Sequence, residues 1–117
     1  MSMKKKKKFS SNYLEKIPEK NTKLRWTSDN EGIVTLEIDN VGIFNKLAQK
    51  LLKKPPVSYV HLDNFGSFVW SIIDGEKNII SIGEYVKENF GEKAEPLYER
   101  LAKFFQILES YNFITFK

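Results

Sequence analysis

Residues 62–75 read LDNFGSFVWSIIDG, and this stretch anchors the fold that the rest of the chain predicts. Asp63 suits a helix N-cap, because its carboxylate can accept a bond from an amide of the first turn. Asp74-Gly75 ends the pattern, since glycine readily takes the left-handed conformation that closes many helices. A helix over residues 64–73 is therefore predicted, and its apolar face consists of Phe65, Phe68, Val69, Ile72 and Ile73.

Three strands are predicted before this helix. Residues 23–28 and 33–38 are rich in alternating apolar and polar side chains, and they flank the turn residues 29–32, which is typical of a β-hairpin. Residues 57–62 alternate again and predict a third, short strand at a sheet edge. Between the second and third strands, residues 41–54 have apolar side chains at helical spacing and end at Pro55-Pro56, so a helical insertion is expected there.

Two more helices are predicted after it. Asn78 suits the N-cap of a helix over residues 79–90, which Gly91 ends, and a last helix runs from about residue 94 to 111. Residues 113–116 form a short extended tail. The predicted fold class is α+β: a small three-stranded antiparallel sheet is followed by three helices, with a helical insertion between strands two and three. This order is winged helix-turn-helix-like.

The basic charge of the chain is concentrated at its start. The net charge is +4, yet Lys4–Lys8 supply five of the nineteen basic residues, and without them the chain carries a charge of about −1. No apolar stretch follows the lysines, so the segment does not fit a signal peptide. We expect residues 1–20 to be a basic, disordered segment and residues 21–117 to be a single domain. The lysine run is either a solvated start or a tether to nucleic acid or acidic lipid.

The composition offers little for catalysis. The chain has no cysteine and one histidine, His61, which excludes disulfide frameworks, cysteine-ligated metal and thiol chemistry. Gly-rich phosphate loops are absent, and the paired glutamates stand at helical spacing beside lysines, as on a solvated helix face. We therefore expect no enzyme, no catalytic residue, no metal site and no cofactor. The apolar runs are too short to span a bilayer, so a cytoplasmic protein without membrane contact is expected.

The last helix carries nearly two apolar stripes. One consists of Leu97, Leu101, Phe105 and Leu108, and the other of Arg100, Phe104, Ile107 and Tyr111. The second stripe has two explanations: the domain wraps this helix on both sides, or a groove beside it receives an extended peptide. The edge of the third strand also has two possible roles: it accepts a peptide as an added strand, or the 41–54 insertion covers it.

The charges on the predicted helices disfavour nucleic acid binding. A DNA-reading helix needs lysine or arginine for phosphates and base edges. Residues 79–90 contain Lys87 against Glu84 and Glu88, and the last helix has three glutamates against two basic residues. A winged-helix DNA regulator and a general protein–protein adaptor are kept as alternatives.

Residues 62–75 and the segments after them resemble a known family. Residues 62–75 resemble the central motif of the PqqD family, a leucine and an aspartate followed by a helix that ends in Asp-Gly. Residues 78–91 are similar to the family's next helix, and residues 97–113 to its final helix. The resemblance covers about residues 57–114, and the upstream hairpin fits the family's first two strands. The chain departs from the family pattern at Asn78 and Ser81, where many members have threonine and glutamate, and in its longer 41–56 insertion.

The resemblance implies a function without catalysis. Family members act as recognition elements, or chaperones, for ribosomally made and then modified peptides: they hold the leader of a precursor peptide and present it to a modifying enzyme, often a radical SAM enzyme. The leader adds as a strand against the third strand, which the resemblance assigns to Val57, Ser58, Tyr59, Val60 and His61. Its apolar side chains enter a cleft beside the last helix, lined by Arg100, Lys103, Phe104 and Ile107.

Overall fold

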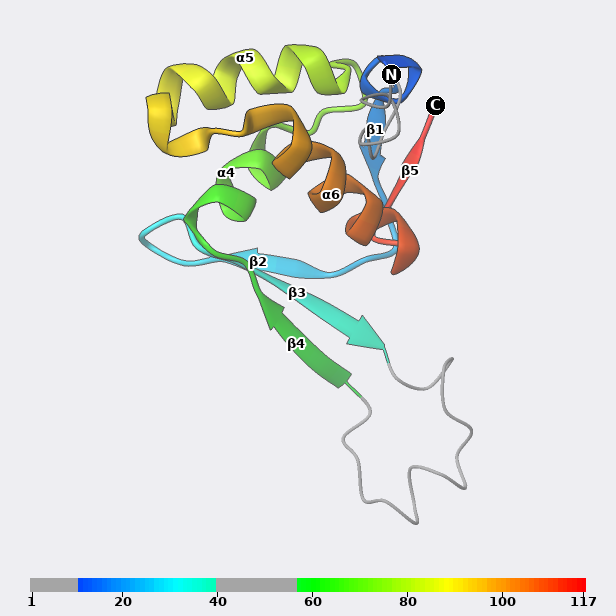
Figure 1. The fold of residues 1–117 in the computed structure, drawn as a ribbon. Helices are drawn as coiled ribbons and strands as arrows, with labels where there is room; N and C mark the ends of the chain where they lie inside the picture. Colours follow the sequence, from blue (N-terminus) through cyan, green and yellow to red (C-terminus); the bar gives the residue numbers. More distant parts are fainter. Residues whose placement is uncertain (1–10, 40–56) are drawn as a thin grey trace. The chain divides into compact units, whose positions relative to one another are not determined.

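A computed structural model describes residues 11–39 and 57–117 of the chain. The described residues confirm the α+β class, with small antiparallel sheets and helices between and after the strands (Figure 1). They form two compact units, Thr22–Ser67 and a second unit made of residues 11–21 and Phe68–Lys117. The winged helix-turn-helix arrangement stays a prediction. The lysine run at 4–8 and the predicted helix at 41–54 lie outside the described residues.

The unit Thr22–Ser67 contains the three strands that the sequence predicts. They are β2 (Trp26–Ser28), β3 (Val34–Asp39) and β4 (Val57–His61), paired antiparallel in the order β2-β3-β4 (Figure 1). The turn between β2 and β3 is held by Asp29, whose Oδ1 accepts from the N–H groups of Glu31 and Ile33 at 2.8 and 2.9 Å. Gly32 has a φ of 84°, which glycine adopts without steric cost. These contacts confirm the hairpin.

Ser67 closes the ladder between β3 and β4 with its hydroxyl group. The N–H of Leu62 donates to the Val34 carbonyl at 2.9 Å, which extends the register of the two strands by one pair. The N–H of Val34 donates instead to Ser67 Oγ at 2.9 Å, and the Ser67 hydroxyl donates to the Leu62 carbonyl at 3.3 Å. Ser67 is buried, so its hydroxyl satisfies backbone groups that water does not reach.

Replacing Ser67 by alanine is therefore expected to lower the free energy of unfolding by about 1–3 kcal/mol, because the Val34 N–H loses its acceptor in a buried place. Urea denaturation measures this. Ser71→Ala is the matched control: Ser71 lies in the same helix, is exposed and donates to the carbonyl of Phe68 in its own helix. A loss no larger in the Ser67 variant than in the control would contradict the bridging role.

The other unit is mainly helical. Its elements in chain order are α2 (Ser11–Leu14), β1 (Pro18–Lys20), the end of α4 (Asn64–Ile72), α5 (Ile79–Phe90), the 3₁₀ helix η1 (Gly91–Ala94), α6 (Leu97–Ser110) and β5 (Ile114–Phe116). The apolar side of α5 and the first of the two stripes predicted for α6 point inward. Their fully or almost fully buried members are Ile79, Ile82, Val86, Leu97, Leu101, Phe105 and Leu108.

Residues 11–20 correct the expectation that residues 1–20 are disordered. α2 is followed by β1, which pairs antiparallel with β5 in a two-stranded sheet, so the ends of the described chain lie side by side (Figure 1). Pro18 is buried in this sheet. The same pairing shows that the predicted extended tail is a strand. Local pattern could not predict this sheet, because its two strands stand almost a hundred residues apart in the sequence.

Individual residues at their ends determine where α5 and α6 begin and end. Asn78 caps α5, with its Oδ1 accepting from the N–H of Ser81 at 2.8 Å, and Gly91 ends it with a φ of 62°, both as predicted. The last helix begins at Leu97 and not near Ala94 as predicted. Glu95 has an extended backbone, with φ −75° and ψ 145°, because proline disfavours the helical conformation of the residue before it.

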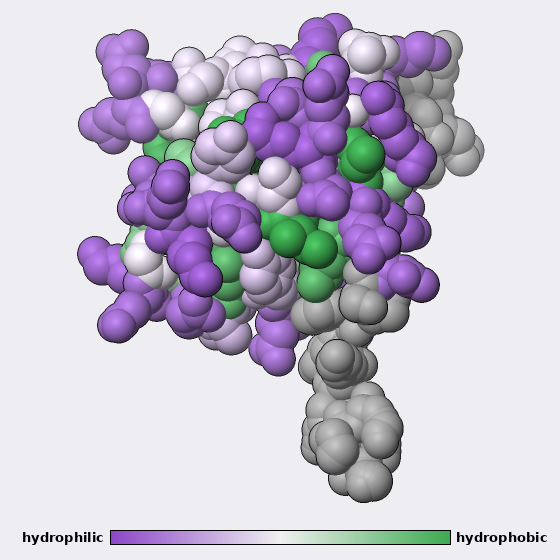
Figure 2. Space-filling view, turned by 90° about the horizontal axis from the view of Figure 1, so that it is seen from above, coloured by the Kyte–Doolittle hydropathy of each residue, from purple (hydrophilic) through white to green (hydrophobic). Residues whose placement is uncertain are grey.

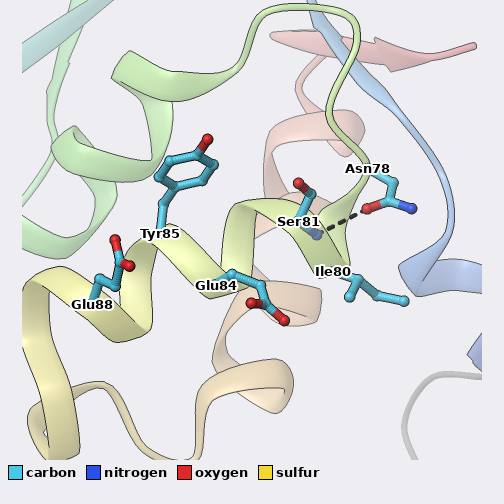
Figure 3. A pocket seen from close by; sticks show the side chains of 6 residues that line it. All are labelled: Asn78, Ile80, Ser81, Glu84, Tyr85 and Glu88. Carbon is cyan, nitrogen blue, oxygen red and sulfur yellow. Dashed lines mark hydrogen bonds between the residues drawn. The ribbon is translucent and has the colours of Figure 1, made fainter.

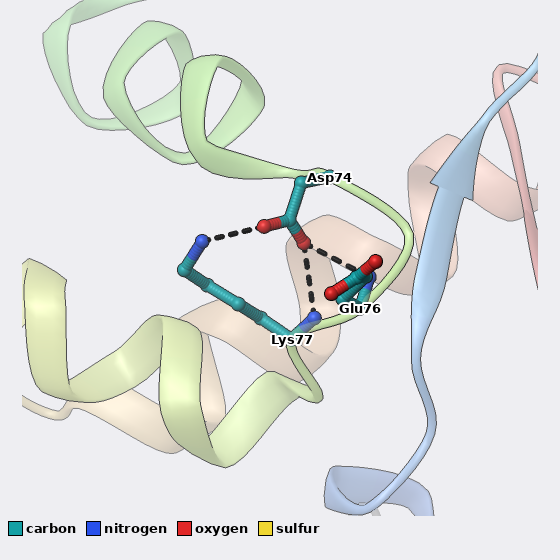
Figure 4. Close-up of polar contacts among 3 residues, drawn as sticks. All are labelled: Asp74, Glu76 and Lys77. Atoms are coloured by element: carbon teal, nitrogen blue, oxygen red, sulfur yellow. Dashed lines mark hydrogen bonds and ion pairs between the residues drawn. The ribbon is translucent and has the colours of Figure 1, made fainter.

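Asp74 organises the loop between α4 and α5 (Figure 4). Its Oδ1 accepts from the N–H groups of Glu76 and Lys77, at 2.9 and 3.0 Å, and its Oδ2 lies 2.7 Å from Lys77 Nζ. The Lys77 hydrogen bond, followed by the two backbone donors, holds the pKa of Asp74 well below its ordinary value. The sequence predicts the end of the helix at Asp74-Gly75, and the structure adds how the loop is held.

Tyr13 gives the chain a pH-dependent stability. Its half-buried position, and then the charge of Glu109, raise the pKa of Tyr13 to about 12. The unfolded chain releases this proton near pH 10, so between pH 10 and 12 the folded state holds more protons and stability falls as pH rises. After allowance for solvent screening, wild type is expected to lose about 1 kcal/mol more than Tyr13→Phe across this window. Denaturant titrations at several pH values test this, and parallel profiles would contradict it.

Candidate functional site

β4 forms one edge of its sheet in the described part of the chain. It pairs with β3 on one side, and no described strand pairs with its other side. A strand edge of this kind presents backbone N–H and C=O groups that can accept a further strand. The predicted edge strand is thus present over Val57–His61.

The register shows which backbone groups of β4 point outward. Leu62 donates to Val34, so Leu62 and every second residue before it, Val60 and Ser58, direct their backbone groups at β3. On the far side of β3, Glu37 donates to the Arg25 carbonyl at 3.0 Å, and this agrees with the same alternation. It follows that Val57, Tyr59 and His61 direct their N–H and C=O groups away from β3.

Side chains of β4 alternate between the two faces of the sheet. Val60 and Leu62 are half-buried, on the face that carries the buried side chains of Val34 and Leu36. Tyr59 and His61 point to the other face, where Tyr59 is 61% exposed. His61 Nδ1 lies 2.8 Å from Thr35 Oγ1 on the neighbouring strand. His61 is therefore hydrogen-bonded on the surface of the sheet.

α6 carries its second stripe on the outside of its unit. Ile107 is 48% exposed, Tyr111 is exposed and Phe104 is half-buried, with its ring edge-on to Phe105 at 5.8 Å between centroids. The stripe is therefore not absorbed by the core of this unit. Ile107 and Tyr111 therefore leave apolar surface on the outside of this helix.

Two basic residues accompany this stripe, Arg100 as its first member and Lys103 beside it. Lys103 is exposed, and Arg100 is half-buried with its Nη1 donating to the Lys93 carbonyl of η1 at 2.9 Å. Arg100 is thereby held over the start of the helix, and its charge stays next to the stripe. A guest with apolar and acidic side chains suits such a surface.

The nine predicted binding residues thus fall into two groups. Val57, Ser58, Tyr59, Val60 and His61 form β4 in one unit, and Arg100, Lys103, Phe104 and Ile107 stand on one side of α6 in the other. That both groups face a single cleft stays a prediction.

Two kinds of site are absent from the described residues. Over 11–39 and 57–117 no three histidine, cysteine or acidic side chains cluster as a metal ion would require. No helix in those ranges has the length and apolar character to cross a bilayer.

Sequence reasoning missed one exposed surface. Ile80 and Tyr85 stand on the outer face of α5 together with Glu84 and Glu88. The signal was present in the sequence, because Ile80 falls outside the inward stripe of Ile79, Ile82 and Val86.

Comparison with known proteins adds a family. The family model described as Coenzyme PQQ synthesis protein D (PqqD) matches residues 45–114, more than half of the chain. No curated protein and no solved structure matches the chain.

Proposed function

The chain belongs to the PqqD family, and from this we propose that it captures the leader of a ribosomally made precursor peptide and presents it to a modifying enzyme. The family is a non-catalytic accessory domain associated with peptide biosynthesis. The observation that carries the proposal is the edge of β4, where Val57, Tyr59 and His61 direct backbone groups away from the sheet.

In this proposal the leader adds to β4 as an extra strand. Backbone groups of the guest pair with Val57, Tyr59 and His61, and such main-chain bonds give affinity that depends little on sequence. Selectivity comes from the guest's side chains. Peptide side chains on the same face of the sheet as Val60 contact apolar surface. Peptide side chains on the opposite face lie beside Tyr59.

The second part of the proposal is that apolar side chains of the leader pack on α6. Ile107 supplies exposed apolar area and Phe104 is half-buried beside it, and Arg100 and Lys103 favour a peptide with acidic residues nearby. We expect a dissociation constant in the micromolar range or tighter, about −8 kcal/mol or better.

The protein then acts by proximity. Holding the leader raises the effective concentration of the core peptide at a bound enzyme to about the millimolar range. No bond is made or broken by this chain. A radical SAM enzyme is the proposed partner.

Phe104→Asp tests the α6 part of the proposal. The probe is a peptide identified by searching the genes beside this chain's gene for a short precursor. A titration with it is expected to show affinity reduced more than tenfold, since a carboxylate buried under the bound peptide opposes apolar packing. Gln106→Asp is the matched control: it adds the same charge to an exposed position on another side of α6. Equal affinity in the two variants, with both folded by circular dichroism, would remove Phe104 from the binding surface.

A DNA regulator is less well supported by the charges. The exposed side chains of α5 include Lys87 but also Glu84 and Glu88. Phosphate backbones need clusters of positive charge, and this helix face carries a net negative one.

A further inference from the structure

The outer face of α5 combines apolar and acidic side chains around a shallow hollow of about 510 Å³ (Figure 3). Ile80 is 38% exposed and Tyr85 is 47% exposed, while the inward residues of the same helix are fully buried. Glu84 and Glu88 stand one helical turn apart, and the hydroxyl of Ser81 and the amide of Asn78 complete the lining. On this side the surface shows hydrophobic patches set among hydrophilic side chains (Figure 2).

The carboxylates of Glu84 and Glu88 are exposed at the surface. Within the described residues, neither side chain takes part in an ion pair. Lys77 stands beside this face, with its Nζ 5.4 Å from the centre of the Tyr85 ring, and its charge is paired with Asp74, whose Oδ2 lies 2.7 Å from that Nζ. Lys87 stands three residues from Glu84 and is exposed, so it offsets part of the charge but not both carboxylates.

We propose that this face of α5 docks a basic segment of a partner protein, in which an arginine or lysine stands next to an aliphatic or aromatic side chain. Carboxylates at i and i+4 lie about 5–6 Å apart at their Cβ atoms, a spacing that one or two basic side chains can bridge. Ile80 and Tyr85 supply the apolar contact beside them. An acidic segment or a nucleic acid is repelled by the same charges.

The negative charge of this face of α5 distinguishes it from the outer stripe of α6. Arg100 and Lys103 accompany the outer stripe of α6, so a basic segment suits α5 and not α6. Docking at α5 therefore stands independently of peptide capture by β4 and α6. If both hold, the chain can bind a peptide and a protein of opposite charge at the same time.

A phage-displayed library of random linear peptides tests the docking. The library is selected on the full chain, and each enriched peptide is then titrated against the full chain and against the Glu84→Gln/Glu88→Gln double variant. We expect enriched peptides that carry lysine or arginine next to an apolar residue, with binding weakened more than tenfold by the double variant and by Tyr85→Ala. Raising the salt from about 0.05 to 0.5 M is expected to weaken binding as well. Neutral or acidic binders, or binders indifferent to the double variant, would overturn the proposal.

Three controls make the result specific. Glu31→Gln/Glu99→Gln removes the same charge from exposed positions elsewhere and is expected to change the affinity less than twofold. Phe104→Asp is also expected to leave these peptides bound, which separates this face from the precursor peptide. The third control replaces Lys4–Lys8 by serine. A more than tenfold gain in affinity there would show that the chain's own lysines occupy the face and would overturn the proposal of a partner.

Discussion

Proline at position 59 is expected to lower the affinity for the precursor peptide about a hundredfold and to leave the domain folded. The N–H of Tyr59 points away from β3, so its removal breaks no bond of the sheet. Proline is tolerated in edge strands where its missing N–H would face solvent. A bound precursor peptide, by contrast, loses the hydrogen bond from the N–H of residue 59 to one of its carbonyl groups. The proline ring also clashes with the peptide at this position.

Val60→Pro is the matched variant, one residue away. The N–H of Val60 points at β3, opposite Leu36, so this proline is expected to lower the free energy of unfolding by about 3 kcal/mol. Urea denaturation and peptide titration of both variants separate the two effects. If the two prolines destabilise the domain equally, the assigned alternation of backbone groups is wrong.

Trp70→Ala is expected to cause the largest loss of stability, about 3–5 kcal/mol. Trp70 lies in α4 and is fully buried, and Lys20 Nζ stands 5.3 Å from the centre of its ring. Alanine removes the whole ring and leaves a cavity that rigid helices cannot fill. Thermal and urea unfolding, followed by circular dichroism, measure the change.

Trp26 provides the control for this prediction. It stands in β2 and is 38% exposed, so Trp26→Ala removes the same side chain from a partly solvated place. We expect a loss of less than about 1 kcal/mol, in line with surface substitutions. Similar losses in both variants would show that Trp70 does not serve as the core residue that its burial indicates.

Features set by neighbouring residues could be predicted from the sequence. The hairpin depends on Asp29 and Gly32, and α5 on its cap Asn78 and its terminator Gly91, so each signal lies inside the element that it defines. The pairing of β1 with β5 could not be predicted in this way. Three residues at each end carry too little pattern to reveal a partner so distant in the sequence.

Part of the candidate site could be predicted from the sequence, because it too depends on local spacing. Spacing alone gives the second stripe on α6, and the exposure of Ile107 confirms that the core of its unit leaves this stripe uncovered. Spacing cannot say which residues of β4 point their backbone outward, because this follows from the pairing with β3. The bridge through Ser67 also depends on residues that meet only in the folded chain.

Hydrogen exchange of the β4 amides tests strand addition most directly. Amide exchange is followed by NMR in the free chain and after addition of the precursor peptide. We expect the amides of Tyr59 and His61 to exchange fast in the free chain and to become protected on binding, while those of Ser58 and Val60 are protected throughout. Binding without new protection at Tyr59 and His61, or protection of both already in the free chain, would contradict capture of the leader as an added strand.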